Sequence, residues 1–258
     1  MRDTAVSPDG ISIVYDVDGV GMPALVFIHG WSCDRTYWAP QMRAFGRGHT
    51  VVAIDLAGHG VSGDGRESWT MKAFGGDVTA VLDRLGIDDI VLIGHSMGGD
   101  VIVETAMARG DRLRGLVWVD TYNALGSPLS QAEIDEFVQP FAVDFVGSVR
   151  ELVHGMFPPG ADPELVDWVA EDMASAPPAI ALDALPRAIG NAGPILNRLL
   201  EVRVPIVAIN PDYRPNDEAS LRQYGVRSVI MSGVGHFSMM EDPDQFNRVL
   251  AEVIEEFG

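Results

Sequence analysis

One stretch of the chain, residues 90–99, restricts the possible folds more than any other. It reads Ile-Val-Leu-Ile-Gly-His-Ser-Met-Gly-Gly. Four branched apolar residues in a row are typical of a strand that is buried on both faces. Residues 94–98 then match the pattern G-x-S-x-G, and residues 100–109 are predicted to form a helix. This strand–turn–helix would strain the backbone of Ser96 and raise its hydroxyl above the sheet, where a base can activate it.

Segments with strand and helix patterns alternate along the rest of the chain. Residues 11–16 alternate apolar and polar side chains, as a half-exposed edge strand would. Further buried strands are predicted at residues 24–28, 50–54, 113–119, 206–209 and 228–231, and helices at residues 71–85, 217–224 and 245–257. This alternation is typical of an α/β fold with a mostly parallel, doubly wound sheet.

Residues 122–201 interrupt the alternation. They contain no strand pattern, several prolines and many large apolar side chains, with helical spacing around residues 135–145, 164–173 and 180–189. We interpret this segment as a helical lid above the strand ends, where ligands bind in open α/β sheets. The predicted division is therefore an α/β core at residues 1–121 and 202–258, with a lid at residues 122–201.

A serine hydroxyl becomes nucleophilic only when a histidine accepts its proton, and an acid must orient that histidine. His236 is the best candidate among six histidines. It follows a predicted strand through the flexible residues 232–235 and comes late in the chain. This position gives the order serine, acid, histidine that accompanies a G-x-S-x-G turn.

Acyl transfer also needs two hydrogen-bond donors directed at the oxyanion. The backbone N–H of Met97, directly after Ser96, is one candidate. The second is the backbone N–H of Trp31, which follows His29-Gly30 after the strand at residues 24–28. We expect His29 to shape this turn, and we expect the side chain of His95 to pack away from Ser96. No histidine pair has metal-ligand spacing, so neither a metal nor another cofactor is predicted.

Charge and cysteine content restrict the possible partners. A formal net charge of −19 repels nucleic acids and anionic lipid surfaces. The single cysteine, Cys33, excludes an internal disulfide and fits a reducing compartment. Residues 1–20 have no apolar stretch of signal-peptide length, and no run is long enough to span a bilayer. These features predict a cytoplasmic protein that acts on a small molecule and binds neither nucleic acid nor membrane.

Four motifs together make the chain resemble the α/β-hydrolase fold family over nearly its whole length. They occupy residues 29–31 (His-Gly-Trp), 55–62 (Asp-Leu-Ala-Gly-His-Gly-Val-Ser), 94–99 and 233–236 (Gly-Val-Gly-His). Within that family the chain is most similar to cofactor-free serine esterases of the non-haem haloperoxidase and perhydrolase branch. The resemblance implies an eight-stranded sheet, a lid between the sixth and seventh strands, and a catalytic triad of serine, histidine and acid. Relatives with aspartate as nucleophile, the haloalkane dehalogenases and epoxide hydrolases, lose support because Ser96 occupies that position.

The acid is where the sequence departs from the family pattern. Most members place it after the seventh strand, where this chain reads Asn-Pro-Asp-Tyr-Arg-Pro over residues 210–215. Asp212 is the nearest match and is the preferred acid. Asp120, at the end of the strand at residues 113–119, is the rival, because some relatives carry the acid there. Asp217 is a third candidate, but we expect it to cap a helix.

The resulting prediction is a carboxylesterase-like serine hydrolase that cleaves a small carboxylic ester or lactone through an acyl-enzyme intermediate. Two alternatives remain. The same residues could hydrolyse a carbon–carbon bond, in which case the lid should hold polar groups for a second carboxylate. A ligand receptor on this fold would show little turnover. The sequence does not identify the substrate, because a fold does not determine it. It also leaves open whether the protein forms a homodimer.

Overall fold

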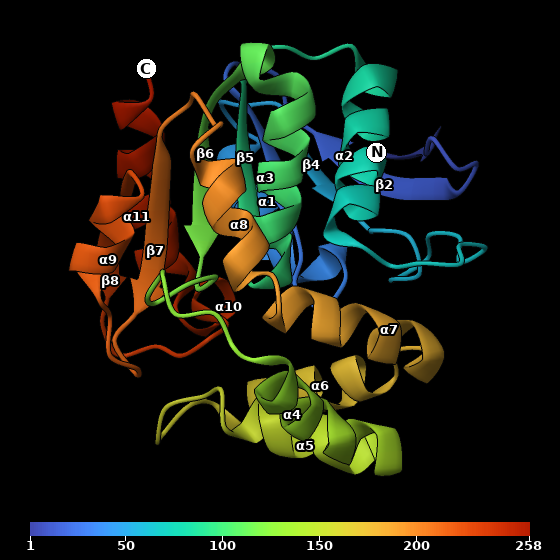
Figure 1. Ribbon diagram of the computed structural model, residues 1–258. Coiled ribbons are helices and arrows are strands. Elements are labelled where there is room, and N and C mark those ends of the chain that lie inside the picture. Colours follow the sequence, from blue (N-terminus) through green and yellow to red (C-terminus); the bar gives the residue numbers. More distant parts are fainter.

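The computed structural model describes residues 1–258, and its centre is one sheet of eight strands with helices on both faces (Figure 1). The strands run in the spatial order β1-β2-β4-β3-β5-β6-β7-β8. Their bounds are β1 Arg2–Val6, β2 Ser12–Asp18, β3 Ala24–Ile28, β4 Val51–Ile54, β5 Ile90–His95, β6 Leu113–Val119, β7 Ile206–Pro211 and β8 Val226–Met231. β1 pairs antiparallel with β2, and β2 with β4, whereas all other neighbours are parallel. This confirms the predicted α/β fold class and the eight-stranded, mostly parallel sheet.

The middle of the sheet is covered on both faces, which explains its apolar sequence. Every residue of β3, β4, β5 and β7 is buried. Most residues of the edge strands β1 and β8 are half-buried or exposed. A strand buried on both faces reads as a continuous apolar run and a half-exposed one does not. The runs at residues 24–28 and 113–119 were therefore recognisable to the residue.

Helices on the two faces fix the strand ends. α2, α3 and α8 lie together on one face, and α1 and α11 contact each other on the other face. The helices are α1 Ala39–Phe45, α2 Met71–Leu85, α3 Met97–Arg109, α4 Gln131–Val143, α5 Phe145–His154, α6 Pro163–Ala174, α7 Pro178–Ile189, α8 Ala192–Leu199, α9 Glu218–Gln223, α10 Ser238–Glu241 and α11 Pro243–Glu256, with short 3₁₀ turns at Arg35–Trp38 and Gly110–Arg112. None of them is long and apolar enough to cross a membrane.

Four helices, α4 to α7, lie beyond the carboxyl ends of the parallel strands, and we call them the cap helices (Figure 1). They fall within the predicted lid at residues 122–201. α8 falls within that range too, but it packs on α3 of the sheet layer, where Arg198 Nε lies 3.1 Å from Glu104 Oε1. The division of the chain into a core and a lid stays a prediction. Although α8 falls within the predicted lid range, it packs against the core.

Several elements differ from the expectations. The strand expected at the edge is β2, which is an inner strand because β1 pairs with it outside. β1 was missed because its sequence, Arg-Asp-Thr-Ala-Val, has a single buried residue. The helix expected over residues 135–145 ends at Val143, and α5 begins at Phe145. Asp144 separates the two helices, since its side chain accepts a hydrogen bond from Gly147 N and caps α5.

Candidate active site

Ser96 sits in the tight turn between β5 and α3, as the motif predicts. Its backbone is in the left-handed region, with φ 52° and ψ −120°, which a residue with a side chain rarely adopts. The turn is held by a hydrogen bond of 2.9 Å from Ser96 N to Val119 O. α3 starts at Met97, three residues earlier than expected, so the Ser96 side chain stands at the helix N-terminus.

Two glycines make this turn possible by letting the backbone pass closely. A Cβ at Gly98 would lie 2.6 Å from the carbonyl oxygens of Ile28 and His29. A Cβ at Gly94 would collide with the Gly98 carbonyl. The glycines of the G-x-S-x-G pattern are therefore required by the contact between β3, β5 and α3.

His236 is paired with Asp120. His236 Nδ1 lies 2.6 Å from Asp120 Oδ2, and both residues are buried, at 8% and 5% exposure. Asp120 follows β6 with a positive φ of 44°, and its N–H donates to Ile209 O at 3.0 Å. The carboxylate also accepts hydrogen bonds from Tyr213 Oη at 3.2 Å and from Asn123 Nδ2 at 3.3 Å. Burial beside this carboxylate raises the pKa of Tyr213, so the phenol stays a donor.

The preferred acid, Asp212, does not reach the imidazole, and this corrects the sequence-based placement. Asp212 is exposed, and its Oδ1 accepts a hydrogen bond of 3.0 Å from Gly233 N. It therefore fastens the loop before His236 from outside. β7 extends to Pro211, two residues further than expected, which carries Asp212 past the site. Asp217 caps α9, as expected, by accepting from Ser220 N.

Two residues that the sequence interpretation did not single out hold the His236 loop. The Glu241 carboxylate accepts from Gly235 N at 2.8 Å and from Phe237 N at 3.0 Å. The Met156 carbonyl, at the end of α5, accepts from His236 N at 2.9 Å. The first contact has a local signal, since Glu241 lies only a few residues after His236, in the short helix α10. No local pattern reveals the second, which joins segments 80 residues apart in the sequence.

Two further histidines, His95 and His29, lie near the site and bond to the backbone around it. His95 is buried under His236, with the ring centroids 4.5 Å apart, and its Nε2 donates to the His236 carbonyl at 2.9 Å. Burial holds the pKa of His95 well below its usual value, so the ring is neutral. His29 shapes its own turn as expected, with Nδ1 donating to Gly30 O and Nε2 accepting from Leu56 N.

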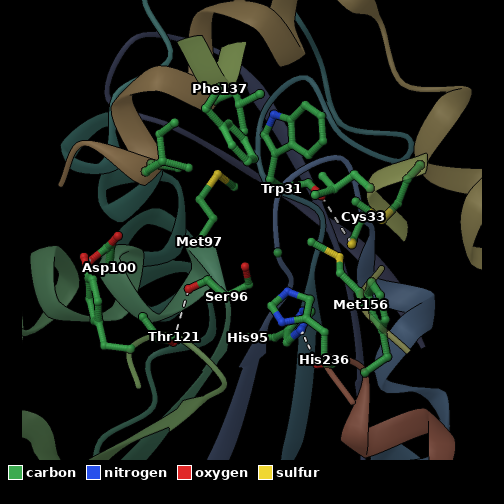
Figure 2. Close-up of a pocket in the computed structure, with 18 residues that line it drawn as sticks. Trp31, Cys33, His95, Ser96, Met97, Asp100, Thr121, Phe137, Met156 and His236 are labelled. Carbon is green, nitrogen blue, oxygen red and sulfur yellow. Dashed lines mark hydrogen bonds between the residues drawn. The ribbon is translucent and has the colours of Figure 1, made fainter. Parts of the chain in front are cut away.

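Ser96 and His236 open into one cavity of about 280 Å³ between the sheet and the cap helices (Figure 2). Most of its lining is apolar, including Phe137, Met156 and Met173 of the cap side. Trp31 and Met97 also line it. The N–H of Met97 opens α3 and so has no carbonyl within the helix to bond. Asp100 contributes the only carboxylate of the lining apart from the buried Asp120 behind His236.

No group of three or more His, Cys, Asp or Glu side chains is arranged to hold a metal ion. The electrostatics of the cavity therefore come from Ser96, the pair of His236 and Asp120, and Asp100. A nucleophile, a base with an orienting acid, and unpaired backbone donors are the parts that acyl transfer requires.

Comparison with known proteins also finds hydrolases and their relatives. A model described as the alpha/beta hydrolase family matches residues 25–249. The chain is 35% identical over 111 residues to a non-heme chloroperoxidase of Kitasatospora aureofaciens, a stretch that covers 42% of this chain and 40% of the relative. The chain spans 30% to 43% of the length of the curated relatives that it matches at 32% to 35% identity.

Solved structures cover the whole chain. A thermophilic esterase from Thermogutta terrifontis superposes with a TM-score of 0.85 at 23% identity, covering 100% of this chain and 99% of the esterase. A structure described as Est816, an N-acyl homoserine lactone degrading enzyme, has a TM-score of 0.81 at 26% identity and covers 96% of this chain and 99% of that one. At 23% identity, the similarity to the Thermogutta terrifontis esterase concerns the fold alone.

Proposed function

Because the chain belongs to the alpha/beta hydrolase family, we propose that it is a serine hydrolase that cleaves a small carboxylic ester or lactone through an acyl-enzyme on Ser96. One observation carries the proposal. A strained serine at a helix N-terminus and a buried pair of histidine and aspartate share one cavity. Strain of this kind persists where the surrounding structure holds it in place, and it gathers at active sites.

In the proposed reaction, Ser96 Oγ attacks the carbonyl carbon while His236 Nε2 takes the hydroxyl proton. Asp120, rather than Asp212, orients the ring through its Nδ1–H and stabilises the imidazolium. The backbone N–H groups of Trp31 and Met97 bind the oxyanion. The imidazolium then protonates the leaving alcohol, which departs and leaves an acyl group on Ser96. Water, activated by the same imidazole, hydrolyses this acyl-enzyme and restores the serine.

The Ser96–His236 contact must tighten in this scheme when substrate binds. The side chain of His236 forms a hydrogen bond with Asp120 and none with Ser96. Catalytic hydrogen bonds are often long before substrate binds. The cavity of about 280 Å³ with apolar walls supports a small acyl or alcohol group. Lactones belong in the test because of the relative described as degrading N-acyl homoserine lactones.

The charges that line the cavity do not favour the alternative of a carbon–carbon bond hydrolase. A substrate with a second carboxylate needs a cation or several donors, and no lysine or arginine lines the cavity. The arginines of the predicted lid are paired elsewhere: Arg150 with Glu171, Arg187 with Asp183, and Arg198 with Glu104. The ligand-receptor alternative predicts little turnover of any ester, so measured ester hydrolysis distinguishes it from an enzyme.

The test is active-site labelling combined with kinetics. An alkyl fluorophosphonate should add its mass to the peptide that contains Ser96 and to no other. A panel of p-nitrophenyl esters and of lactones with graded acyl length should be hydrolysed by the wild type. Ser96→Ala should abolish labelling and lower turnover by about 10⁴-fold or more. A Ser96→Ala variant with full activity, or labelling at another residue, contradicts the proposal.

A further inference from the structure

Asp100 is an acid in the cavity for which the proposed reaction has no use. It lies in the first turn of α3, four residues after Ser96. Residues spaced by four lie on one side of a helix, about 6 Å apart along its axis. Asp100 therefore sits one helical turn from the nucleophile, and Figure 2 shows it across the Ser96 backbone from His236.

The carboxylate of Asp100 is only half satisfied. Its Oδ1 accepts a hydrogen bond of 2.9 Å from the Tyr122 hydroxyl. No hydrogen bond of ordinary geometry reaches its Oδ2, although the amide of Asn191 is close enough to lower the pKa of Asp100. Asp100 lines the cavity and is 2% exposed. A buried oxygen with a free lone pair is an acceptor that a ligand can use.

No cation compensates this charge. No lysine or arginine lines the cavity, and Arg198 of the adjoining α8 is paired with Glu104 one turn further along α3. The amide Nδ2 of Asn191, just before α8, is buried near Asp100 but completes no hydrogen bond of ordinary geometry. Burial raises the pKa of Asp100 to about 7, against the lowering effect of Asn191 and Tyr122. Carboxyl groups kept in such surroundings cost stability, and perturbed acids in a cleft gather at functional sites.

Most of the cavity lining is apolar, so few other acceptors compete with Oδ2 of Asp100 for a donor on the substrate. A substrate with an ammonium or hydroxyl group would complete the hydrogen bonding of this oxygen. Above pH 7, where Asp100 is mostly ionised, a substrate with a carboxylate would meet a like charge in a dry cavity, which is strongly disfavoured. The net charge of −19 acts in the same direction on approaching ions.

We propose that Asp100 is a specificity-determining residue that binds a hydrogen-bond donor on the ester, an ammonium or a hydroxyl group, and rejects esters that carry a carboxylate. This inference rests on the proposed ester hydrolysis at Ser96. It deepens that function by naming the substrate class, which is small, mostly apolar esters or lactones with one donor group.

The experiment uses two matched series of p-nitrophenyl and alkyl esters on the intact protein. One series varies the end of a four- to six-carbon acyl chain between methyl, hydroxyl, ammonium and carboxylate. The other varies the end of the alcohol in the same way. In one of the two series, kcat/KM of the wild type should be about 10-fold or more higher for the ammonium ester than for the methyl ester. The carboxylate ester should be the poorest of the four.

Asp100→Asn keeps the size of the side chain and removes its charge. The preference for the ammonium ester should disappear, and the carboxylate ester should gain because the amide offers it a donor. Glu104→Gln is the matched control: it neutralises an acid on the same helix that does not line the cavity, and it should keep the wild-type order. The wild-type order itself tests the proposal should the Asn variant fold poorly.

Two failures are distinguishable. If the wild type hydrolyses the methyl esters and labels at Ser96 but treats all four ends alike in both series, the role of Asp100 is overturned and ester hydrolysis stands. The same holds if Asp100→Asn keeps the ammonium preference. If no ester or lactone is hydrolysed and Ser96 is not labelled, the proposed function itself is overturned.

Discussion

Asp120 combines the features that an orienting acid needs. Its carboxylate is buried, which strengthens the interaction with an imidazolium, and it accepts hydrogen bonds from Tyr213 and Asn123 besides the one from His236. Its backbone has a positive φ, as does that of Ser96. Two strained residues at the ends of neighbouring strands β5 and β6 therefore direct their side chains to one site.

Replacing the acid tests this assignment. Asp120→Asn keeps the shape but loses the charge and the correct ring tautomer, so kcat should fall by about 10³- to 10⁴-fold with little change in substrate binding. Asp212→Asn is the matched control and should stay within a few-fold of the wild type, since Asp212 bonds only to the loop backbone. Steady-state kinetics on folded protein, checked by circular dichroism, measures both. The reverse result would return the role to Asp212.

The choice between these two acids was beyond local sequence patterns. The placement of Ser96 and His236 at one cavity was predictable because the G-x-S-x-G turn has a steric cause and the histidine follows a strand late in the chain. Asp120 and Asp212 both follow strand ends, and the difference depends on where each strand stops. β6 ends at Val119 and the chain turns at once, whereas β7 continues through Pro211 in register with β8. Pairing of this kind is a tertiary property.

At the scale of elements, the cap helices are attached to the core through few polar contacts. Trp31 Nε1 donates to Ala181 O of α7 at 2.9 Å, and Tyr37 Oη donates to Asp172 Oδ2 of α6 at 2.8 Å. The Met156 carbonyl bonds to His236 N. Because these contacts meet around the cavity, the position of the cap helices and the geometry of the site are linked.

Tyr37→Phe removes one of these attachments while keeping the ring that packs on Trp168. The half-buried Asp172 carboxylate then loses its donor, so the free energy of unfolding should fall by about 1–3 kcal/mol. Tyr15→Phe is the matched control. It removes a hydroxyl that bonds to Asp3, whose side chain is 42% exposed and can be solvated by water, so it should cost less. Urea unfolding measures both, and equal losses would show that the contact with Asp172 adds nothing.

Element type was predictable from periodicity, but boundaries in the cap helices were not. The spacing of apolar residues located α2 to the residue, because one face of that helix is buried and Thr70 caps it. α1, α5 and α8 were not predicted, and neither was the break at Asp144. Each of these helices has ten residues or fewer, so its apolar periodicity extends over too few turns to be recognised.

At the scale of the whole molecule, buried titratable groups give the stability an unusual dependence on pH. Burial lowers the pKa of His29 to about 4 and that of His59 to about 3. These rings are neutral in the fold but take up protons below about pH 6.5 when the chain unfolds, so their contribution to stability falls with falling pH. Asp100 has the opposite sign. Its pKa is raised to about 7, so the folded state holds a proton that the unfolded state releases, and its contribution falls with rising pH.

Variants at two of these positions should shift the pH profile in opposite directions. Between pH 7 and pH 5, the neutral ring of His59 loses about 2 kcal/mol of stability, and Asp100 gains about 2 kcal/mol over the same interval. His59→Gln keeps a donor for the Ala57 carbonyl but does not titrate, so it should lose less stability on acidification than the wild type. Asp100→Asn should lose more on acidification, and it should be more stable than the wild type above pH 7. Urea unfolding at pH 5, 7 and 8 measures these differences against the wild-type profile. If the stability profiles of both variants run parallel to that of the wild type, burial of His59 and of Asp100 does not change the number of protons taken up or released on folding.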